Sequence, residues 1–391
     1  MPDLRPLKRL DWPLFAAVLA LCLYGLVMIY SATRAAETTG LGAPSEFVLK
    51  QALWLLFALL AFALTLLLDY EKIVRWHVLP YCAILLLLLV VLKIGRGPNG
   101  AARWLALGGL SLQVSELAKI AVILSISGFL SRRIQAVAQL RVVLASLLIP
   151  AAPVFLVLIQ PNLGTALVII AIWFGALYLV GARARHLGAA FACGLVLFCL
   201  LWNLDRLPLD NMRPAPLGKM LAHVALKDYQ KRRIAVFLHP QSDPLGAGYH
   251  VIQSRVAVGS GQLWGRGLFQ GTQSRLRFTP ERHTDFIFSV VGEELGLLGA
   301  LAMLLLYLFL FWRGLRVALH ARDPLGSLLA AGAVSMLIFH ALINIGMSIN
   351  ILPITGLPLP FVSYGGSNLL ASFLAFGLLQ NVHIRQESLI F

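Results

Sequence analysis

The feature that most constrains this chain is a series of apolar runs, each of roughly 20 residues, the length that an α-helix needs to cross a bilayer. Such runs are typical of membrane-spanning helices, because a helix satisfies its backbone hydrogen bonds within one segment. We therefore predict an all-α polytopic membrane protein with a single integral membrane domain over residues 1–391. The ten expected spans are 12–31, 48–68, 76–94, 113–130, 142–159, 163–180, 187–204, 286–312, 325–350 and 361–383.

The composition agrees with this prediction, and the distribution of charge indicates which kind of ligand the protein binds. The sequence is 59% hydrophobic and 13% charged, whereas soluble domains contain about 25% charged residues. Its net charge of +15 comes from basic residues in the loops between apolar runs, which favours anionic lipid or a phosphorylated lipid substrate over nucleic acid. All four cysteines lie within apolar runs, so we expect packing residues, with no metal cluster or disulfide framework.

Basic residues in the short loops predict the orientation, because they accumulate on the cytoplasmic side of a membrane. With the N-terminus inside, the cytoplasmic segments hold fourteen Lys and Arg residues and the short external loops hold five. Both termini are therefore expected in the cytoplasm, with a large external loop over 205–285 between the seventh and eighth spans. The five external basic residues are Arg34, Lys50, Lys93, Arg96 and Arg103.

Two stretches of the long external loop are distinctive. Residues 218–238 form a basic amphipathic pattern, which predicts a helix along the membrane surface. Residues 246–273 are rich in glycine, which permits tight turns and a close approach of the backbone to a ligand.

Four acids gather where this loop meets the eighth span. Glu281 and Asp285 lie at the border, and Glu293 and Glu294 lie within the apolar run. Carboxylates are costly in hydrocarbon, so each of them is a functional hypothesis. For Asp285 the alternative is structural, because together with Thr284 it could cap the helix of the eighth span.

Helical spacing separates these acids. At about 100° per residue, Asp285, Ser289 and Gly292 share one stripe, whereas Glu294 points roughly to the opposite side. The two glutamates therefore cannot both face the site that Asp285 faces. We expect at least one of them to pair with a basic residue of a neighbouring helix.

A second polar group lies at the head of the fourth span. Glu116 and Lys119 are three residues apart and share a helix face, so they can pair. One interpretation is a structural ion pair, and the other is that Lys119 and Arg103 bind phosphate while Glu116 holds the lysine in place. Trp104 is either an aromatic-belt residue or a wall for lipid or sugar.

The ninth span carries a polar stripe of His340, Asn344 and Ser348 at intervals of four residues. Hydrogen bonding between helices is one explanation, and the lining of a polar cavity is the other. The sequence contains no P-loop, H-E-x-x-H or G-x-S-x-G motif. A reaction would therefore need a substrate that carries its own activation, such as a lipid pyrophosphate.

Several motifs taken together resemble those of the SEDS family (shape, elongation, division and sporulation), the RodA/FtsW group of bacterial cell-wall polymerases. The resemblance covers almost the whole chain, and N-I-G-M at 344–347 and G-L-P-L-P at 356–360 look more like the RodA branch. The shared motifs are N-G-A-A-R-W at 99–104, Q-V-S-E-L-A-K at 113–119, Q-P-N-L-G-T-A at 160–166, the glycine-rich stretch from 246, P-E-R-H-T-D-F-I-F at 280–288 and L-P-L-P-F-V-S-Y-G-G-S at 357–367.

The resemblance implies a peptidoglycan glycosyltransferase that polymerises lipid II onto a nascent glycan strand at the outer face of the bacterial cytoplasmic (inner) membrane. It also implies a class B penicillin-binding protein of the elongation type as the transpeptidase partner. The family's essential acid falls on Asp285, which would act as general base while polyprenyl pyrophosphate leaves. Arg103, Lys119 or a divalent cation (Mg²⁺ or Mn²⁺) would stabilise the leaving group.

The candidate substrate-binding residues lie on the external side, within or near these motifs. They are Arg103, Trp104, Glu116, Lys119, Gln253, Ser254, Ser260, Glu281, His283, Thr284, Ser363 and Ser367.

The chain departs from the family pattern at two positions. Relatives have Asp where this chain has Asn162, so we expect a structural role at this position. Relatives have Pro where this chain has Val114, so the start of the fourth span is less certain than in the family pattern.

Two other functions compete with polymerisation. One is a lipid II flippase, and the other is a non-catalytic scaffold for the penicillin-binding protein.

Overall fold

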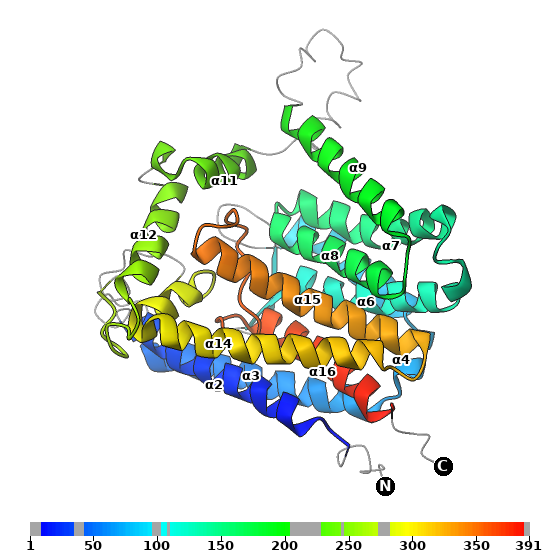
Figure 1. The fold of residues 1–391 in the computed structure, drawn as a ribbon, viewed down its shortest axis with the longest axis horizontal. Helices are drawn as coiled ribbons and strands as arrows, with labels where there is room; N and C mark the ends of the chain where they lie inside the picture. The colour runs from blue at the N-terminus through cyan, green and yellow to red at the C-terminus, as the bar shows by residue number, and fades with distance from the viewer. Residues whose placement is uncertain are drawn as a thin grey trace.

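The computed structural model describes residues 9–34, 43–95, 103–107, 110–203, 228–243, 246–272 and 282–386. Helices dominate this part of the chain, and many of them run side by side as a bundle (Figure 1). The helices of the bundle are α2 (Trp12–Thr33), α3 (Pro44–Leu67), α5 (Val78–Ile94), α6 (Val114–Ser131), α7 (Leu140–Ile159), α8 (Leu163–Leu179), α9 (Ala184–Asn203), α14 (Ile287–Leu319), α15 (Pro324–Ser348) and α16 (Gly366–Ile384).

Short elements connect or cover these helices. The strands β1 (Trp104–Leu107) and β2 (Leu110–Gln113) form an antiparallel hairpin in which Trp104 pairs with Gln113. The large loop expected at 205–285 contains α11 and α12, which lie at one end of the bundle (Figure 1). The bounds of the short helices are α4 (Tyr70–Arg75), η3 (Ile134–Ala136), α11 (Asp228–Leu238), η6 (Pro240–Ser242) and α12 (Ala247–Ser260).

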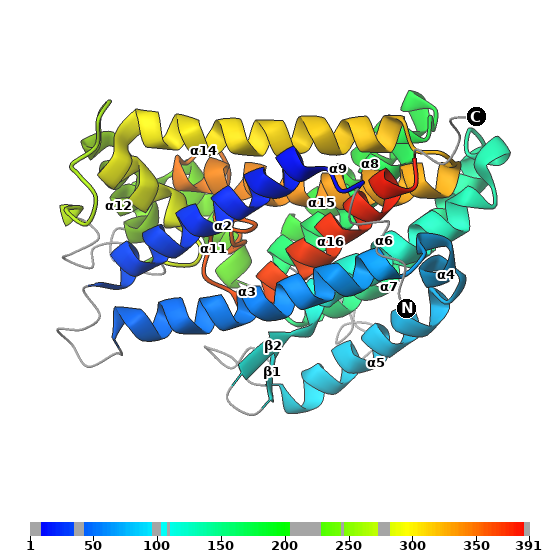
Figure 2. The same ribbon diagram turned by 90° about the horizontal axis from the view of Figure 1, so that it is seen from below.

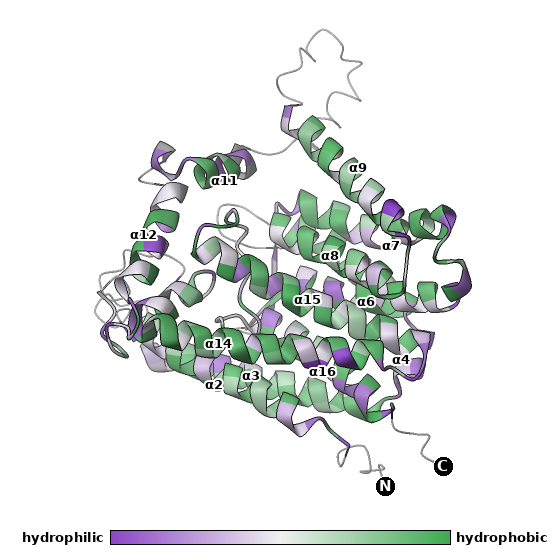
Figure 3. Ribbon diagram, viewed as in Figure 1, coloured by the Kyte–Doolittle hydropathy of each residue, from purple (hydrophilic) through white to green (hydrophobic). Residues whose placement is uncertain are grey.

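Each expected span overlaps one of the ten bundle helices, which are largely apolar along their length (Figure 3). Six of them, α2, α3, α6, α7, α14 and α15, are long and apolar enough to cross a membrane, and α5, α8 and α9 contain shorter apolar stretches. The chain is thus a mostly helical, multi-pass membrane protein, and the count of ten spans stays a prediction.

The core of the bundle lies around α15, which packs against α6, α8, α14 and α16. Figure 2 shows α14, α15 and α16 in neighbouring positions. Small residues along α15, such as Ala330, Ala331 and Ala333, are fully buried and let the neighbouring backbones approach closely. Exposed leucines on α3, α7 and α14 face outward, as expected of surfaces in contact with lipid.

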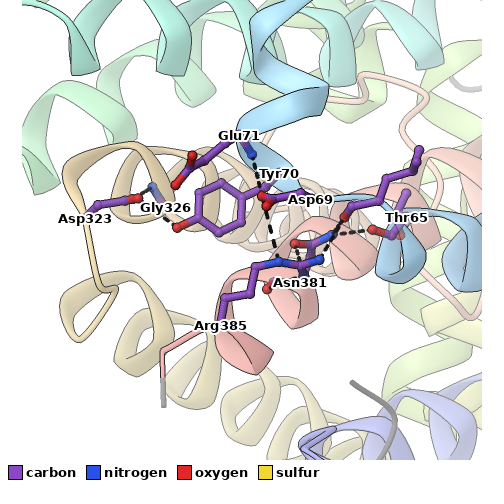
Figure 4. Close-up of polar contacts among 9 residues, drawn as sticks. Thr65, Asp69, Tyr70, Glu71, Asp323, Gly326, Asn381 and Arg385 are labelled. Carbon is purple, nitrogen blue, oxygen red and sulfur yellow. Dashed lines mark hydrogen bonds and ion pairs between the residues drawn. The ribbon is translucent and has the colours of Figure 1, made fainter. Parts of the chain in front are cut away.

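A polar cluster joins the end of α3, the start of α4, the start of α15 and the end of α16 (Figure 4). The Tyr70 hydroxyl donates to Asp323 Oδ2 (2.8 Å), while Asp323 Oδ1 caps α15 by accepting from Gly326 N (2.6 Å). Burial is the largest of the causes that raise the pKa of Tyr70, and the hydrogen bond to Asp323 is the second. Asn381 donates to the carbonyls of Thr65 and Leu68 at the end of α3. These bonds satisfy helix termini that would otherwise leave carbonyls and amides unpaired.

The eighth expected span differs most from the prediction. It extends to Leu319 and is broken at Gly296, which has φ 64° and ψ −161°. A break exposes peptide groups that must find new partners. The turn after α12 supplies them through four bonds: Arg266 N to Glu293 O (3.0 Å), Gly267 N to Glu294 O (3.0 Å), Leu297 N to Gln262 O (2.9 Å) and Leu298 N to Leu263 O (3.2 Å).

This turn explains much of the glycine-rich stretch. A Cβ at Gly261 would lie 1.8 Å from the carbonyl oxygen of Gly292, and one at Gly265 would lie 2.2 Å from that of Glu294. The glycines permit a close backbone approach, as expected. For these two glycines, the backbone approached is that of the broken helix, whereas the sequence suggested a ligand.

The tenth expected span also begins too early. Residues 361–365 form a turn, and α16 starts only at Gly366. Their apolar character, which extended the predicted span, reflects burial in the protein: Phe361 and Val362 are buried in the core. Hydropathy cannot distinguish a buried turn from the first turn of a membrane helix.

We predict that Gly296→Ala lowers the free energy of unfolding by about 2–3 kcal/mol, because alanine is strained at this backbone conformation. The new Cβ would also lie 2.3 Å from Gly265 N. The matched control is Gly194→Ala on exposed α9, where a Cβ meets nothing within 4 Å, and which should stabilise by at most about 1 kcal/mol. Denaturant unfolding in detergent micelles measures both. Equal effects of the two changes would contradict the proposed constraint at Gly296.

Candidate active site

A polar cavity of about 230 Å³ lies at the end of the bundle near the first turn of α14. Its walls combine the β-hairpin, the N-terminus of α8, α11, the loop after α15 and the start of α16. The residues around it include five of the candidates from the sequence. These are Arg103, Trp104, Thr284, Asp285 and Ser367, and they are joined by Gln113, Pro161, Asn162, Arg233, Thr355, Gly356, Pro358, Tyr364, Gly365 and Asn368.

The structure does not support the capping interpretation of Asp285. The N-cap of α14 is Phe286, and no side-chain hydrogen bond caps the helix there. Asp285 lies one residue before the cap and lines the cavity instead. A carboxylate that lines a polar cavity at the start of an apolar helix can contact a substrate that enters the cavity.

Hydrogen bonds from α15 and the following loop hold the backbone beside this carboxylate. The Asn344 amide donates to the carbonyl of Asp285 (2.8 Å) and to that of Leu357 (2.7 Å). The Ser363 hydroxyl donates to Thr284 O (2.6 Å) and accepts from Leu359 N (2.8 Å). Asn344 and Ser363 therefore position the backbone of Thr284 and Asp285. Neither Asn344 nor Ser363 lines the cavity itself.

Arg233 of α11 is a site residue that the sequence did not single out. A Cβ at Gly356 would lie 3.3 Å from Asp285 Oδ2 and 3.7 Å from Arg233 Nη1. The carboxylate and the guanidinium thus flank the same glycine, whose φ of +74° suits a residue without a side chain. Arg233 also donates to the carbonyl of Ile354 (3.4 Å).

The available signal for Arg233 was the basic amphipathic segment at 218–238, which also contains Lys231 and Arg232. Periodicity could not tell which of these cations faces the bundle. The side chain of Arg232 is 67% exposed and pairs with Asp243 (3.0 Å), so these neighbours differ in their surroundings.

Arg103 and Trp104 line the cavity from the side of β1. Arg103 Nε donates to Gln160 O (2.9 Å), and its Nη2 donates to Pro161 O. These bonds fix the guanidinium at the rim. The neighbouring Asn162 caps α8 by accepting from Thr165 N (3.3 Å), which supports the structural role expected at this position.

Lys119 and Glu116 are buried outside the cavity lining. Lys119 Nζ lies 2.7 Å from Glu116 Oε2 and 2.6 Å from His340 Nε2. An ammonium only donates, so His340 Nε2 must accept, which leaves the ring proton on Nδ1 facing the Pro358 carbonyl (3.3 Å). This arrangement favours the structural interpretation of the pair, because Lys119 is 0% exposed and cannot reach a phosphate in the cavity without a rearrangement.

The remaining candidates contribute in other ways. Ser254 is buried and donates to Ser348 O (2.7 Å), and Ser260 donates to Ala257 O (2.9 Å) within its own helix. His283 packs against Phe47 and Tyr364. These residues, and Gln253, are not among those that line the cavity, and Glu281 lies outside the described residues.

Tyr364 connects His283 to the cavity, which it lines. Burial raises the pKa of its hydroxyl further above physiological pH, where a tyrosine with its ordinary pKa is neutral as well. Ser367 also lines the cavity, and its hydroxyl accepts from Gln113 N (2.9 Å).

The two glutamates of α14 tie the turn after α12 to the bundle. Glu294 accepts from the Ser31 hydroxyl (2.6 Å) and from Phe269 N (3.0 Å), and Glu293 accepts from the Thr272 hydroxyl (3.2 Å). Neither glutamate lines the cavity, as the helical spacing predicted for at least one of them. For Glu294, a hydroxyl and a backbone amide take the place of the expected basic partner.

Metal binding was the cofactor option left open by the sequence. Within the described part of the chain, no group of three His, Cys, Asp or Glu side chains is placed to hold a metal ion. The divalent cation therefore stays a prediction, in which the substrate's own phosphates would supply further ligands.

The fold and the site define a multi-pass helical membrane protein with an acid and two arginines around one polar cavity. The family model FTSW_RODA_SPOVE, described as "Cell cycle protein", matches residues 12–388. The chain therefore belongs to the FtsW/RodA (SEDS) family, as its motifs indicated.

Curated relatives carry names from both branches of this family. The peptidoglycan glycosyltransferase MrdB of Escherichia coli (strain K12) is 41% identical over 314 residues, which is 80% of this chain and 79% of that protein. A probable peptidoglycan glycosyltransferase FtsW of Geobacter metallireducens is 36% identical over 98% of this chain and 97% of that protein. The RodA-like assignment consequently stays a prediction.

Solved structures share the fold over nearly the whole chain. A chain from a peptidoglycan synthase complex that coordinates polymerization and crosslinking matches with a TM-score of 0.75 and 30% identity, covering 97% of this chain and 99% of that one. The rod shape determining protein RodA of Thermus thermophilus matches with a TM-score of 0.68 and 28% identity, covering 97% and 98%.

We predict that Lys119→Met lowers the free energy of unfolding by about 3–5 kcal/mol, because it leaves a buried carboxylate without its cation. The double variant Lys119→Met, Glu116→Gln should recover part of this loss, since the charge that lost its partner is removed as well. Denaturant unfolding in detergent measures both. Unchanged stability of the single variant, combined with weaker binding of lipid II, would instead support the phosphate-binding interpretation.

Proposed function

We propose that this chain polymerises lipid II into glycan strands in the cavity beside α14, with Asp285 as the general base. Its family and its curated relatives identify it as a peptidoglycan glycosyltransferase. The observation that supports the proposed mechanism is the lining of the cavity, which brings one carboxylate together with the guanidinium groups of Arg103 and Arg233.

The chemistry needs a base on one side of the reacting carbon and positive charge on the other. Asp285 takes the proton of the acceptor sugar hydroxyl, whose oxygen then forms a bond to the anomeric carbon of the donor. The bond from that carbon to the pyrophosphate oxygen breaks, and the electron pair leaves with the polyprenyl pyrophosphate. Positive groups fixed in advance stabilise this developing negative charge.

Arg233 and Arg103 are our candidates for that stabilisation. A guanidinium presents parallel N–H donors that match the oxygens of a phosphate. Both arginines line the cavity with Asp285, whereas Lys119 is buried in its pair with Glu116. We therefore assign the proposed phosphate site to Arg233 and Arg103. Lys119 is assigned a structural role, in which it contacts His340, whose ring faces the carbonyl of Pro358.

The proposed location follows from the charge asymmetry of the short loops. It puts the cavity at the external face of the bacterial inner membrane, where a lipid-linked substrate can enter from the bilayer while its sugars stay in water. The proposed partner is a class B penicillin-binding protein, which would crosslink the new strand. The fold shared with a chain of a peptidoglycan synthase complex supports such a partnership.

Transport and scaffolding explain the arrangement less well. A lipid II flippase needs a continuous polar path for the headgroup across the membrane, and the cavity of Asp285 does not share a lining residue with the polar cavity at the opposite end of α14. The core between the two ends is packed with side chains such as Leu328, Leu337 and Phe376. A scaffold without activity leaves the grouping of Asp285 with two arginines unexplained.

We predict that Asp285→Asn lowers the rate of lipid II polymerisation by about 10²–10⁴-fold, the usual contribution of a general base. The amide keeps the size of the side chain, so the unfolding midpoint should change little. The assay is gel analysis of glycan products made from labelled lipid II by the purified protein with its penicillin-binding partner. Glu46→Gln, an exposed acid in the first turn of α3, is the matched control. Full activity of Asp285→Asn would rule out the base assignment.

We predict that Arg233→Gln raises the KM for lipid II about tenfold or more, because a charge-assisted hydrogen bond to the phosphate is lost. Arg232→Gln, the adjacent residue on α11, should leave KM within about twofold, since its side chain is largely exposed and pairs with Asp243. Initial rates over a range of lipid II concentrations separate KM from kcat. Equal changes for the two variants would remove Arg233 from the proposed site.

A further inference from the structure

A second cavity lies at the opposite end of α14, beside its last two turns. It has a volume of about 200 Å³ and is formed where α2 begins and where α14 and α16 end. Its polar lining is Asp11, Arg313, Arg316, His320, His383 and Gln386. This set contains one acid against two arginines and two histidines, and none of these residues contributes to the cavity of Asp285.

The single acid is already neutralised by one of the arginines. Asp11 Oδ2 lies 2.6 Å from Arg313 Nη2 and accepts from Arg313 Nε (2.8 Å), while Oδ1 accepts from Leu14 N (3.2 Å) at the start of α2. The Asp11 side chain is only 1% exposed, so it is committed to this pair. The lining therefore has a surplus of positive charge.

Arg316 carries this surplus. Within the described part of the chain, the ion pairs of the structure do not include Arg316. Its guanidinium lies over the ring of Trp312, 4.9 Å from the centroid. A guanidinium that stacks on an aromatic ring uses its planar face for this contact, so the N–H groups at its edge can donate hydrogen bonds to an anion. His320 and His383 add ring nitrogens at the same cavity.

An apolar stripe leads along α14 to this charge. Leu301, Leu305, Leu308 and Trp312 are all exposed and follow one another at intervals of three or four residues, so they share one face of the helix. Arg316 follows Trp312 by four residues and continues that face. Exposed leucines on a spanning helix contact acyl chains, and tryptophan is enriched where those chains meet the headgroups.

We propose that this second cavity binds the phosphodiester headgroup of an anionic phospholipid, with Arg316 as its main contact and the acyl chains along the Leu301–Trp312 face. The guanidinium fork suits phosphate oxygens. The stripe selects a lipid over a soluble phosphate, because only a lipid occupies both features. In the orientation expected from the loop charges this end faces the cytoplasm, where the leaflet contains anionic lipid.

The test measures lipid binding by the full-length protein. Native mass spectrometry of the purified chain in detergent, titrated with dioleoylphosphatidylglycerol or dioleoylphosphatidylcholine, gives the affinity for each lipid. We expect a preference for phosphatidylglycerol that Arg316→Gln weakens about fivefold, the effect of one basic residue near an anionic headgroup. Arg141→Gln, an exposed arginine at the start of α7, removes the same charge elsewhere on the expected cytoplasmic side and should have no effect.

Three outcomes would overturn the proposal. These are equal binding of the two lipids, an equal loss in both glutamine variants, and displacement of phosphatidylglycerol by millimolar inorganic phosphate, which would indicate a soluble-anion site. The unfolding midpoint of each variant checks the fold. If Arg316→Gln is unstable, Arg316→Lys replaces it. Because lysine keeps the charge, this variant should retain the preference for phosphatidylglycerol, and its loss would also contradict the proposal.

Discussion

The amide of Asn344 makes the contact on which the candidate site depends. It donates to the carbonyls of Asp285 and Leu357, which belong to two irregular segments that enter the bundle from different parts of the sequence. Irregular backbone persists within a membrane protein only where protein groups or water satisfy its peptide bonds. One polar side chain near the C-terminal end of the apolar α15 therefore holds the backbone of Asp285 beside the loop that contains Gly356.

The same requirement explains the break in α14. Gly296 interrupts the helix, and the turn after α12 pairs with the carbonyls and amides that the break exposes. Glu293 and Glu294 strengthen this junction through their carboxylates. Two of the acids that the sequence offered as functional candidates thus stabilise the attachment of this segment to the bundle. Their hydrogen-bond partners, and their absence from the lining of the cavity of Asp285, became known only from the tertiary structure.

The general fold followed from local properties of the chain. Each apolar run long enough to span a bilayer overlaps a helix of the described bundle, because hydrophobic length is a property of a continuous segment, and the count of ten spans stays a prediction. The errors lie where an apolar segment is not a regular helix. Phe361 and Val362 are buried in a turn, and the break at Gly296 depends on a partner segment some thirty residues earlier in the sequence. A hydropathy pattern contains no information on either.

For the site, the sequence by itself determined which groups are available, namely a carboxylate at residue 285 and arginines and lysines beside an apolar bundle, and its motifs indicated the FtsW/RodA family. Only the tertiary structure decided which of these side chains meet. It buried Lys119 against Glu116 and His340, and it brought Arg233 to the glycine beside Asp285. The physical reason is that helical periodicity determines the face on which a side chain lies. The neighbour that this face meets depends on how distant helices pack.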